Sequence, residues 1–296
     1  MSGDDLLKAI KRMSEYLDEE SIAVALRIPV ETVHDAIAGN IVIEETETEK
    51  ETIIQIANPA VYRQRIISVW RGRGGVGCTS VALHLAYLLE QMMSVLLVDL
   101  NTACAGSDVS FYLRQPEYPN MEALTHDGQL TQAVIQAEAA LWVLLPPETG
   151  RIDKAKISLL MTEARQGFDA VIFDLPNADD EGILEAVACS NALVMVTTGC
   201  AQEMNRVLAR SNKSQKETVL VANGYACDAK TRKAYPKVVE IPADKDSHAR
   251  MEKGVFYKKG TPLSVGAEKI RNALFGMQPR EKRGFVGRLR GAGGQR

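Results

Sequence analysis

The chain has 296 residues, of which 46% are hydrophobic and 25% are charged, and its formal net charge is -3. This composition is that of an ordinary globular protein with room for one large and one small domain, and the net charge gives no overall preference for nucleic acid or membrane. No apolar run reaches the roughly 18–20 residues that cross a bilayer. The acidic start is unlike a signal peptide, and the 5 cysteines show no disulfide or zinc spacing, so we expect a cytoplasmic protein.

Residues 1–60 predict a small helical domain that ends in an acidic linker. They carry 13 acidic and 5 basic side chains, a net charge of -8. Residues 5–39 have helical periodicity, with a cadence typical of a helix-turn-helix. The third expected helix offers Glu31, His34 and Asp35 where a DNA-reading helix needs basic or amide side chains. We therefore expect residues 5–39 to dock a protein partner or cap the sheet, and we disfavour DNA binding.

Residues 61–279 predict one large α/β domain, because short apolar runs rich in β-branched residues alternate there with helical patterns. Such strands are typical of a mainly parallel sheet with helices on both faces. The expected strands are Ile66–Trp70, Val95–Leu100, Leu141–Leu145, Ala170–Leu175, Ala192–Thr197, Val219–Ala222 and Val238–Ile241. The expected helices include Val81–Gln91, Ala155–Gln166, Asp180–Ala188 and Gln202–Ser211.

A glycine-rich segment separates the first expected strand from the first expected helix of this domain. It reads Gly72-Arg73-Gly74-Gly75-Val76-Gly77-Cys78-Thr79-Ser80. Glycines let successive N–H groups converge, and the helix dipole adds partial positive charge, so a strand, such a turn and a helix N-terminus together form an anion site. The segment therefore predicts phosphate binding.

Two kinds of phosphate site fit this segment. The spacing Gly72-x-Gly74-x-x-Gly77, with Asp99 placed 22 residues after Gly77, fits the dinucleotide fingerprint of an oxidoreductase. The alternative is a P-loop that lacks its lysine. We favour the P-loop, because Thr79 offers a hydroxyl for magnesium and the apolar strand ending at Asp174 offers a carboxylate.

The same motifs resemble the MinD/ParA family of P-loop ATPases over residues 64–277. The glycine-rich segment is similar to the family's deviant Walker A loop, Val98-Asp99-Leu100-Asn101 to its first switch, and Asp174-Leu175-Pro176 to its second. The resemblance implies a P-loop NTPase fold, bound ATP or ADP with Mg²⁺, and a homodimer linked by nucleotide. It assigns to the nucleotide Gly72, Arg73, Gly74, Gly75, Val76, Gly77, Cys78, Thr79, Ser80, Asn223, Pro242 and Asp244, and to the metal Thr79, Asp99 and Asp174.

Three positions depart from the family pattern. Cys78 stands where the Walker lysine reaches the phosphates, Arg73 stands where the signature lysine crosses the dimer interface, and Asn101 stands where a switch aspartate orients water. The resemblance gives catalytic roles to Asp174, Asn101 and Arg73. Losing one preorganised charge costs about 100- to 1000-fold in rate, so we expect an ATPase that is slow or inactive but still binds nucleotide. A thiol at a helix N-terminus, such as Cys78, tends toward a lowered pKa and higher reactivity. The alternative, which we favour over a redox role, is that Cys78 is a small space-filling residue.

Loops without these lysines, attached to a different N-terminal domain, are most similar to the CpaE/TadZ branch of the family. That branch is associated with positioning the pilus assembly machinery. The resemblance thus implies a nucleotide-dependent localisation or assembly factor for a pilus or secretion machinery. The alternatives are an active MinD/ParA-type ATPase in chromosome or plasmid partition or DNA-binding regulation and, less favoured, a dinucleotide-binding oxidoreductase.

Residues 280–296 predict a basic tail rich in glycine and arginine. They carry 6 basic side chains and 1 acidic one. Residues 282–290 resemble the amphipathic membrane-targeting tail of MinD, which implies peripheral contact with the inner face of the membrane. The other hypothesis is a solubilising tail without membrane contact.

Overall fold

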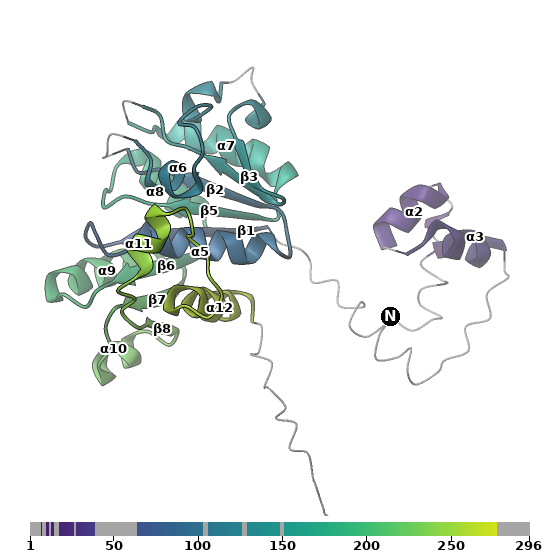
Figure 1. Cartoon of the computed structure of the whole chain (residues 1–296). Helices are drawn as coiled ribbons and strands as arrows, with labels where there is room; N and C mark the ends of the chain where they lie inside the picture. The colour runs from purple at the N-terminus through teal and green to yellow at the C-terminus, as the bar shows by residue number, and fades with distance from the viewer. Residues whose placement is uncertain are drawn as a thin grey trace, which may run out of the picture. The chain divides into compact units, whose positions relative to one another are not determined.

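The computed structural model describes residues 64–102, 106–125, 129–148 and 151–276, together with residues 18–26, 28–38 and a few positions between 7 and 14. Contacts divide the chain into two units, Met1–Arg63 and Gln64–Arg296 (Figure 1). The acidic linker and the tail lie outside the described residues, and so does the membrane hypothesis for residues 282–290. No helix among the described residues is both long and apolar enough to span a bilayer.

In the described part of the small unit, the short helices α2 (Glu19–Leu26) and α3 (Val30–Ala38) pack together. Apolar side chains at helical spacing face each other and form a small core of their own. Its buried members are Ile10, Ile22, Ala23, Val33 and Ala36. Glu31 and His34 of α3 are exposed, so the surface of that helix presents an acid and an imidazole to solvent.

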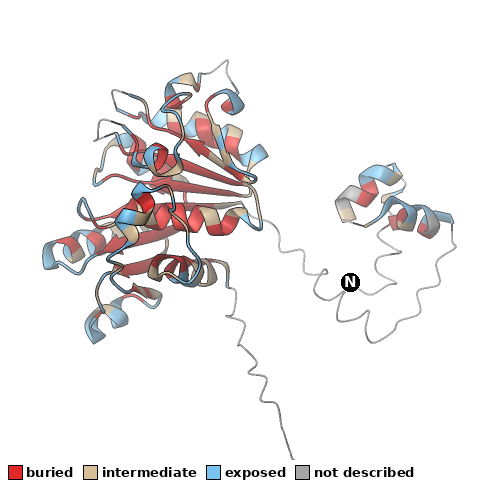
Figure 2. Ribbon diagram, viewed as in Figure 1, coloured by how far each residue is buried: buried red, intermediate tan, exposed pale blue. Residues whose placement is uncertain are grey.

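An eight-stranded sheet runs through the large unit, and its central strands are almost entirely buried (Figure 2). Its order is β3-β4-β2-β5-β1-β6-β7-β8, and every neighbouring pair is parallel except β3 and β4. The strands are β1 (Arg65–Arg71), β2 (Val95–Asp99), β3 (Ile135–Glu138), β4 (Leu141–Leu144), β5 (Ala170–Asp174), β6 (Ala192–Thr197), β7 (Glu217–Asn223) and β8 (Val238–Ile241). The predicted mainly parallel sheet is confirmed.

Helices cover both faces of this sheet, as predicted. One hydrophobic core joins the sheet to α5 and α12, and the other joins its opposite face to α7, α8 and α9. The α-helices are α5 (Cys78–Glu90), α6 (Asp108–Leu113), α7 (Lys154–Gly167), α8 (Glu181–Cys189), α9 (Ala201–Ser214), α10 (Ala229–Ala234), α11 (Ser247–Glu252) and α12 (Pro262–Phe275), and two 3₁₀ turns span Met121–Ala123 and Leu130–Gln132.

The strand order excludes the dinucleotide-binding alternative. In a dinucleotide-binding sheet the second strand lies directly beside the first. Here β5 lies between β1 and β2 and pairs with both of them. The insertion of a later strand at this place puts the end of β5 beside the glycine-rich loop, which is the P-loop NTPase topology.

Candidate functional site

The glycine-rich loop connects the buried strand β1 to α5. Gly77 precedes α5 with φ 86°, a left-handed conformation that favours glycine. A Cβ atom at Gly77 would lie 2.5 Å from Nδ2 of Asn223. That same Nδ2 donates a hydrogen bond of 2.8 Å to the carbonyl oxygen of Val76. Asn223, at the end of β7, therefore lies against the loop, where its amide anchors the loop backbone. Its assignment to the nucleotide stays a prediction.

The tip of the loop is exposed while both of its ends are buried. Arg73, Gly74 and Gly75 are exposed, whereas Gly72 and Val76 are buried. A Cβ atom at Gly72 would lie 2.8 Å from the carbonyl oxygen of Glu203 in α9, so only glycine fits there without a shift of the backbone. The loop is thus fixed at its two ends and presents Arg73 to solvent.

Two buried carboxylates lie at the carboxyl ends of neighbouring strands, beside the start of α5. Asp99 and Asp174 are register partners in β2 and β5. The Thr79 hydroxyl donates a hydrogen bond of 2.6 Å to Oδ2 of Asp174. Asp99 accepts hydrogen bonds from the backbone N–H of Asn101 at 2.9 Å and from the Ser107 hydroxyl at 2.7 Å. The predicted residues Thr79, Asp99, Asn101 and Asp174 therefore form one cluster.

This cluster fits a magnesium ion. Among the described residues, Oδ1 of Asp174 is buried and has no hydrogen-bond partner. Mg²⁺ prefers oxygen ligands and is usually held by one or two carboxylates together with phosphates and water. The described residues contain no group of three or more His, Cys, Asp or Glu side chains suited to a metal. Asp174 and Thr79 would hold the ion, whereas both oxygens of Asp99 are already bonded.

The predicted lowered pKa of Cys78 is wrong. The side chain is 1% exposed. Burial raises the pKa of this thiol well above its ordinary value, and the nearby charge of Asp174 raises it further. The helix N-terminus cannot offset desolvation next to a carboxylate. Cys78 is therefore a neutral, buried thiol at the start of α5.

Burial also raises the pKa of Asp99 to about 7 and that of Asp174 to about 6. Without a bound cation, the folded state therefore binds more protons than the unfolded state as pH rises above 3.8, the ordinary pKa of an aspartate. The stability contributed by protonation is complete below that value and is lost through the folded pKa values. We expect the free energy of unfolding, measured in EDTA without nucleotide, to fall by on the order of 5 kcal/mol between pH 4.5 and 8.

Asp99→Asn removes one of the two titrating groups and is expected to flatten this pH dependence. Denaturant unfolding at several pH values measures how the free energy of unfolding changes with pH in the wild type and in Asp99→Asn. A wild-type chain whose stability rises over this pH window would contradict the buried, metal-free carboxylate pair.

Three residues that the sequence analysis missed hold the surroundings of the loop. Arg206 of α9 donates from Nη1 to the carbonyl oxygen of Gly72 at 3.1 Å. Arg210, one helical turn later, bonds the carbonyl oxygen of Arg71 and stacks over Trp70, with 4.3 Å between the guanidinium carbon and the ring centroid. Ser107 caps α6 while it bonds Asp99. The sequence features that could have revealed these residues are the helical spacing of the two arginines and the serine that precedes Asp108 as a helix cap.

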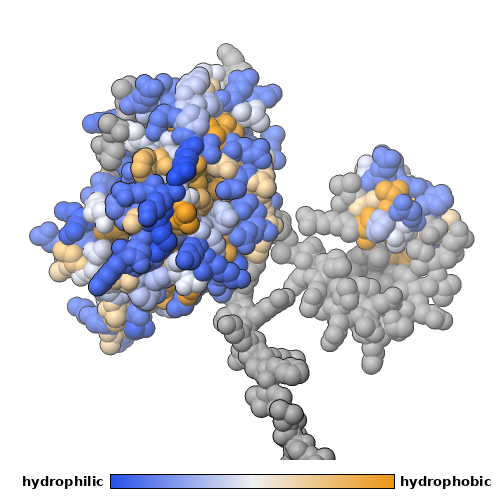
Figure 3. All heavy atoms as spheres, viewed as in Figure 1, coloured by the Kyte–Doolittle hydropathy of each residue, from blue (hydrophilic) through white to orange (hydrophobic). Residues whose placement is uncertain are grey.

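The segment after β8 lies beside the start of α5. The Ser80 hydroxyl is 3.6 Å from Sδ of Met251 in α11. Pro242 is exposed, and the carboxylate of Asp244 is paired with Arg250, which lowers its pKa. Hydrophilic side chains gather on the surface over α11 (Figure 3). The structure thus places Pro242 and Asp244 on one polar wall near the loop, and their roles stay predictions.

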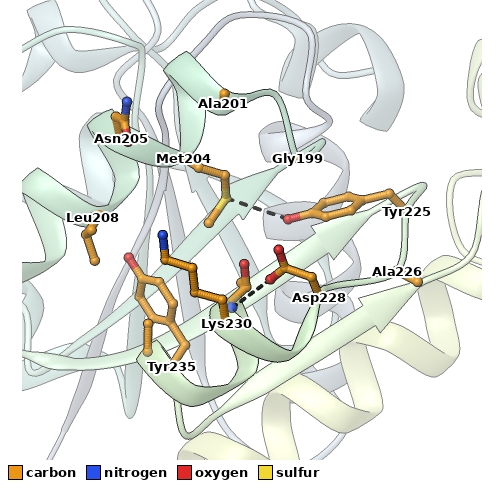
Figure 4. A pocket seen from close by; sticks show the side chains of 12 residues that line it. Gly199, Ala201, Met204, Asn205, Leu208, Tyr225, Ala226, Asp228, Lys230 and Tyr235 are labelled. Carbon is orange, nitrogen blue, oxygen red and sulfur yellow. Dashed lines mark hydrogen bonds between the residues drawn. The ribbon is translucent and has the colours of Figure 1, made fainter.

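A separate cavity of about 500 Å³ lies between α9 and the connection from β7 to α10 (Figure 4). Its lining combines apolar and aromatic side chains, and Tyr225 hydrogen-bonds Sδ of Met204 at 3.6 Å. Main lining residues are Met204, Leu208, Tyr225, Lys230 and Tyr235. None of the predicted site residues lines this cavity, so the loop and the cavity are different places.

Comparison with curated proteins finds septum site-determining proteins. The chain is 28% identical over 141 residues to MinD of Synechocystis, covering 45% of this chain and 53% of that protein. It is 26% identical over 165 residues to MinD of Helicobacter pylori, covering 51% and 62% respectively. The chain spans only about half to three fifths of the length of these relatives. No protein-family model matches it.

Solved structures extend the likeness over most of the large unit. The MinD cell division ATPase of Pyrococcus furiosus matches with a TM-score of 0.61 at 19% identity, over 71% of this chain and 99% of that one. A plasmid partition protein of Borrelia burgdorferi, bound to AMPPNP, matches with a TM-score of 0.60 at 17% identity, over 72% and 99%. MinD of Pyrococcus horikoshii, complexed with Mg-ADP, matches with a TM-score of 0.58 at 20% identity, over 70% and 93%.

The chain has the MinD/ParA ATPase fold, and it is similar in sequence to MinD proteins over about half of its length. The fold places Gly72–Ser80, Asp99 and Asp174 at the end of the sheet where the geometry above brings them together.

Proposed function

We propose that the chain binds ATP or ADP with Mg²⁺ at the loop Gly72–Ser80 and acts as a nucleotide-dependent localisation or assembly factor with slow or no hydrolysis. The observation that carries this proposal is the Thr79–Asp174 hydrogen bond of 2.6 Å next to the unpartnered Oδ1 of Asp174. These two residues offer a metal ion one hydroxyl ligand, from Thr79, and one carboxylate ligand, from Asp174, at the start of α5. The AMPPNP and Mg-ADP bound by structural relatives support the same ligand class.

The proposed slow hydrolysis follows from the side chains that face the phosphate position. Cys78 carries no positive charge, and Asn101 lacks the carboxylate that would orient water. Backbone N–H groups and the Thr79 hydroxyl remain. Ground-state binding therefore persists while stabilisation of the transition state is weakened.

The exposed position of Arg73 supports a nucleotide-linked homodimer. An arginine at the tip of the loop is free to reach the phosphates of a second subunit, where its guanidinium binds them bidentately. In this proposal residues 5–39 dock a protein partner, and residues 282–290 contact the inner face of the membrane. Positioning of a pilus or secretion machinery is the cellular role that we favour, by resemblance to the CpaE/TadZ branch.

Calorimetry with ATP, ADP and NADH, followed by a turnover assay on the same sample, tests the proposal. We expect ATP and ADP to bind, NADH to fail, and phosphate release to be slow or absent. Tight NADH binding without ATP binding would overturn the proposal. Turnover stimulated by a partner or by DNA would favour the alternative, an active partition-type ATPase.

Thr79→Val tests the metal part of the site. We expect the affinity for Mg·ATP to fall about 10- to 100-fold, because the variant loses a metal ligand and leaves Asp174 without its hydrogen bond. Binding of ATP in EDTA should change little. Thr79→Ser keeps the hydroxyl and is the matched control. Equal Mg²⁺ dependence in Thr79→Val and the wild type would remove Thr79 from the site.

A further inference from the structure

Arg71 is a buried cation that the function described so far does not use. It is the last residue of β1, directly before the loop, and it is 8% exposed. Its Nε has no hydrogen-bond partner among the described residues. Arginine is rarely buried unless its charge is paired. The burial of Arg71 therefore requires negative charge nearby.

The register of the sheet places Arg71 on the same face as the two carboxylates. Val69 is the register partner of Asp174, and Asp174 is the register partner of Asp99. Partners in neighbouring strands project to the same face, and Arg71 follows Val69 by two residues, so it projects to that face as well. Val69 and Cys78 belong to the core on the α5 side. Arg71 thus lies two residues beyond the register position of the two carboxylates, on the face of the sheet that packs against α5.

The charge of Arg71 acts on the residues of the site. Burial raises the pKa of Asp174, and the Arg71 guanidinium opposes that rise. Burial likewise raises the pKa of Cys78, and Arg71 again acts in the opposite direction. The nearby Arg206 and Arg210 are already bonded to the carbonyl oxygens of Gly72 and Arg71. Arg73 is exposed at the loop tip.

We propose that Arg71 provides positive charge to the β- and γ-phosphates of the bound nucleotide from the β1 end of the loop. This charge would replace the lysine charge that is missing at Cys78, at the α5 end of the loop. This inference rests on the proposed nucleotide binding. A guanidinium keeps its charge when buried and binds phosphate oxygens bidentately. Its unpartnered Nε is a donor that a phosphate oxygen would satisfy. Arg71 is thus a binding residue for the phosphates of a nucleoside di- or triphosphate.

The test measures binding of ATP, ADP and AMP to the full chain by calorimetry. Arg71→Met removes the charge and is expected to weaken ATP and ADP binding about 10- to 100-fold while AMP binding changes little, since a hydrogen bond to a charged group contributes about 1.5–3 kcal/mol. Arg71→Lys keeps the charge and should stay within several-fold of the wild type. Arg71→Met/Cys78→Lys, which restores a cation from the helix side, should recover ATP affinity. Arg151→Met, at an exposed arginine outside the proposed site, is the matched control and should leave ATP binding unchanged.

The outcomes separate this inference from the proposed function. A wild-type chain that binds neither ATP nor ADP overturns the proposed function. Wild-type binding together with equally tight ATP binding by folded Arg71→Met overturns the Arg71 assignment alone, and so does an equal loss of affinity for ATP and AMP. If Arg71→Met does not fold, Arg71→Gln keeps donors without the charge and carries the same comparison.

Discussion

Cys78→Lys/Asn101→Asp is expected to raise steady-state ATP turnover by at least about 100-fold over the wild type, because each substitution restores one preorganised charge of a kind that contributes about 100- to 1000-fold. The two changes are made together for a physical reason. Asn101 is 7% exposed beside Asp99, so aspartate alone would add a third acid to a buried cluster. The lysine adds the compensating charge. Phosphate release under excess Mg·ATP measures the effect.

Matched variants separate charge from volume in this experiment. Cys78→Met fills the same position without charge and should leave turnover at the wild-type level. Asn101→Asp alone should lower the free energy of unfolding more than it changes turnover. If the double variant, correctly folded, is no faster than the wild type, the proposed cause of slow hydrolysis is wrong. Wild-type turnover as fast as that of the double variant would equally contradict it.

Gly77→Ala is expected to lower the free energy of unfolding by about 2–4 kcal/mol and to abolish measurable ATP binding. The new Cβ would lie 2.5 Å from Nδ2 of Asn223, at a position with φ 86°. Strain of this kind alone costs about 1–3 kcal/mol. Displacing Asn223 also breaks its bond to the Val76 carbonyl, which leaves a buried polar group unsatisfied. Thermal and denaturant unfolding, together with calorimetry, measure the two losses.

Gly74→Ala is the matched control within the same loop. A Cβ at Gly74 meets nothing within 4 Å, and its φ is not positive. We expect its stability to stay within about 1 kcal/mol of the wild type, since alanine mainly restricts the unfolded chain. Equal destabilisation by both substitutions would show that Asn223 does not anchor the loop.

The sequence predicted the parallel strands well because each one is a continuous apolar run buried on both faces. The expected strands at Ala192–Thr197 and Val238–Ile241 have the observed bounds, and the others differ by one or two residues. β3 escaped prediction because it is an edge strand in which half-buried and exposed residues alternate, so it lacks such a run. The short helices α6, α10 and α11 were missed because 6 residues are too few to show helical periodicity.

The residues of the site that lie at the end of a strand or the start of a helix could be predicted from the sequence. Asp99 and Asp174 end β2 and β5, and Thr79 opens α5, so their meeting followed from parallel topology. Arg71 could not be assigned, because its sequence position says nothing about burial beside two acids. The lowered pKa expected for Cys78 failed for the same reason, since the helix N-terminus was visible in the sequence and the carboxylate of Asp174 beside the thiol was not.

Arg210 connects α9 both to the segment after β5 and to the end of β1. Its guanidinium bonds Asn177 and Asp179, which follow β5, as well as the Arg71 carbonyl at the entrance of the loop. Trp70, beneath it, donates a hydrogen bond to the Pro176 carbonyl at 3.1 Å. The segment after β5 therefore cannot swing away from β1 without releasing α9. A displacement of residues 176–179 would therefore either break these hydrogen bonds or move α9 with it.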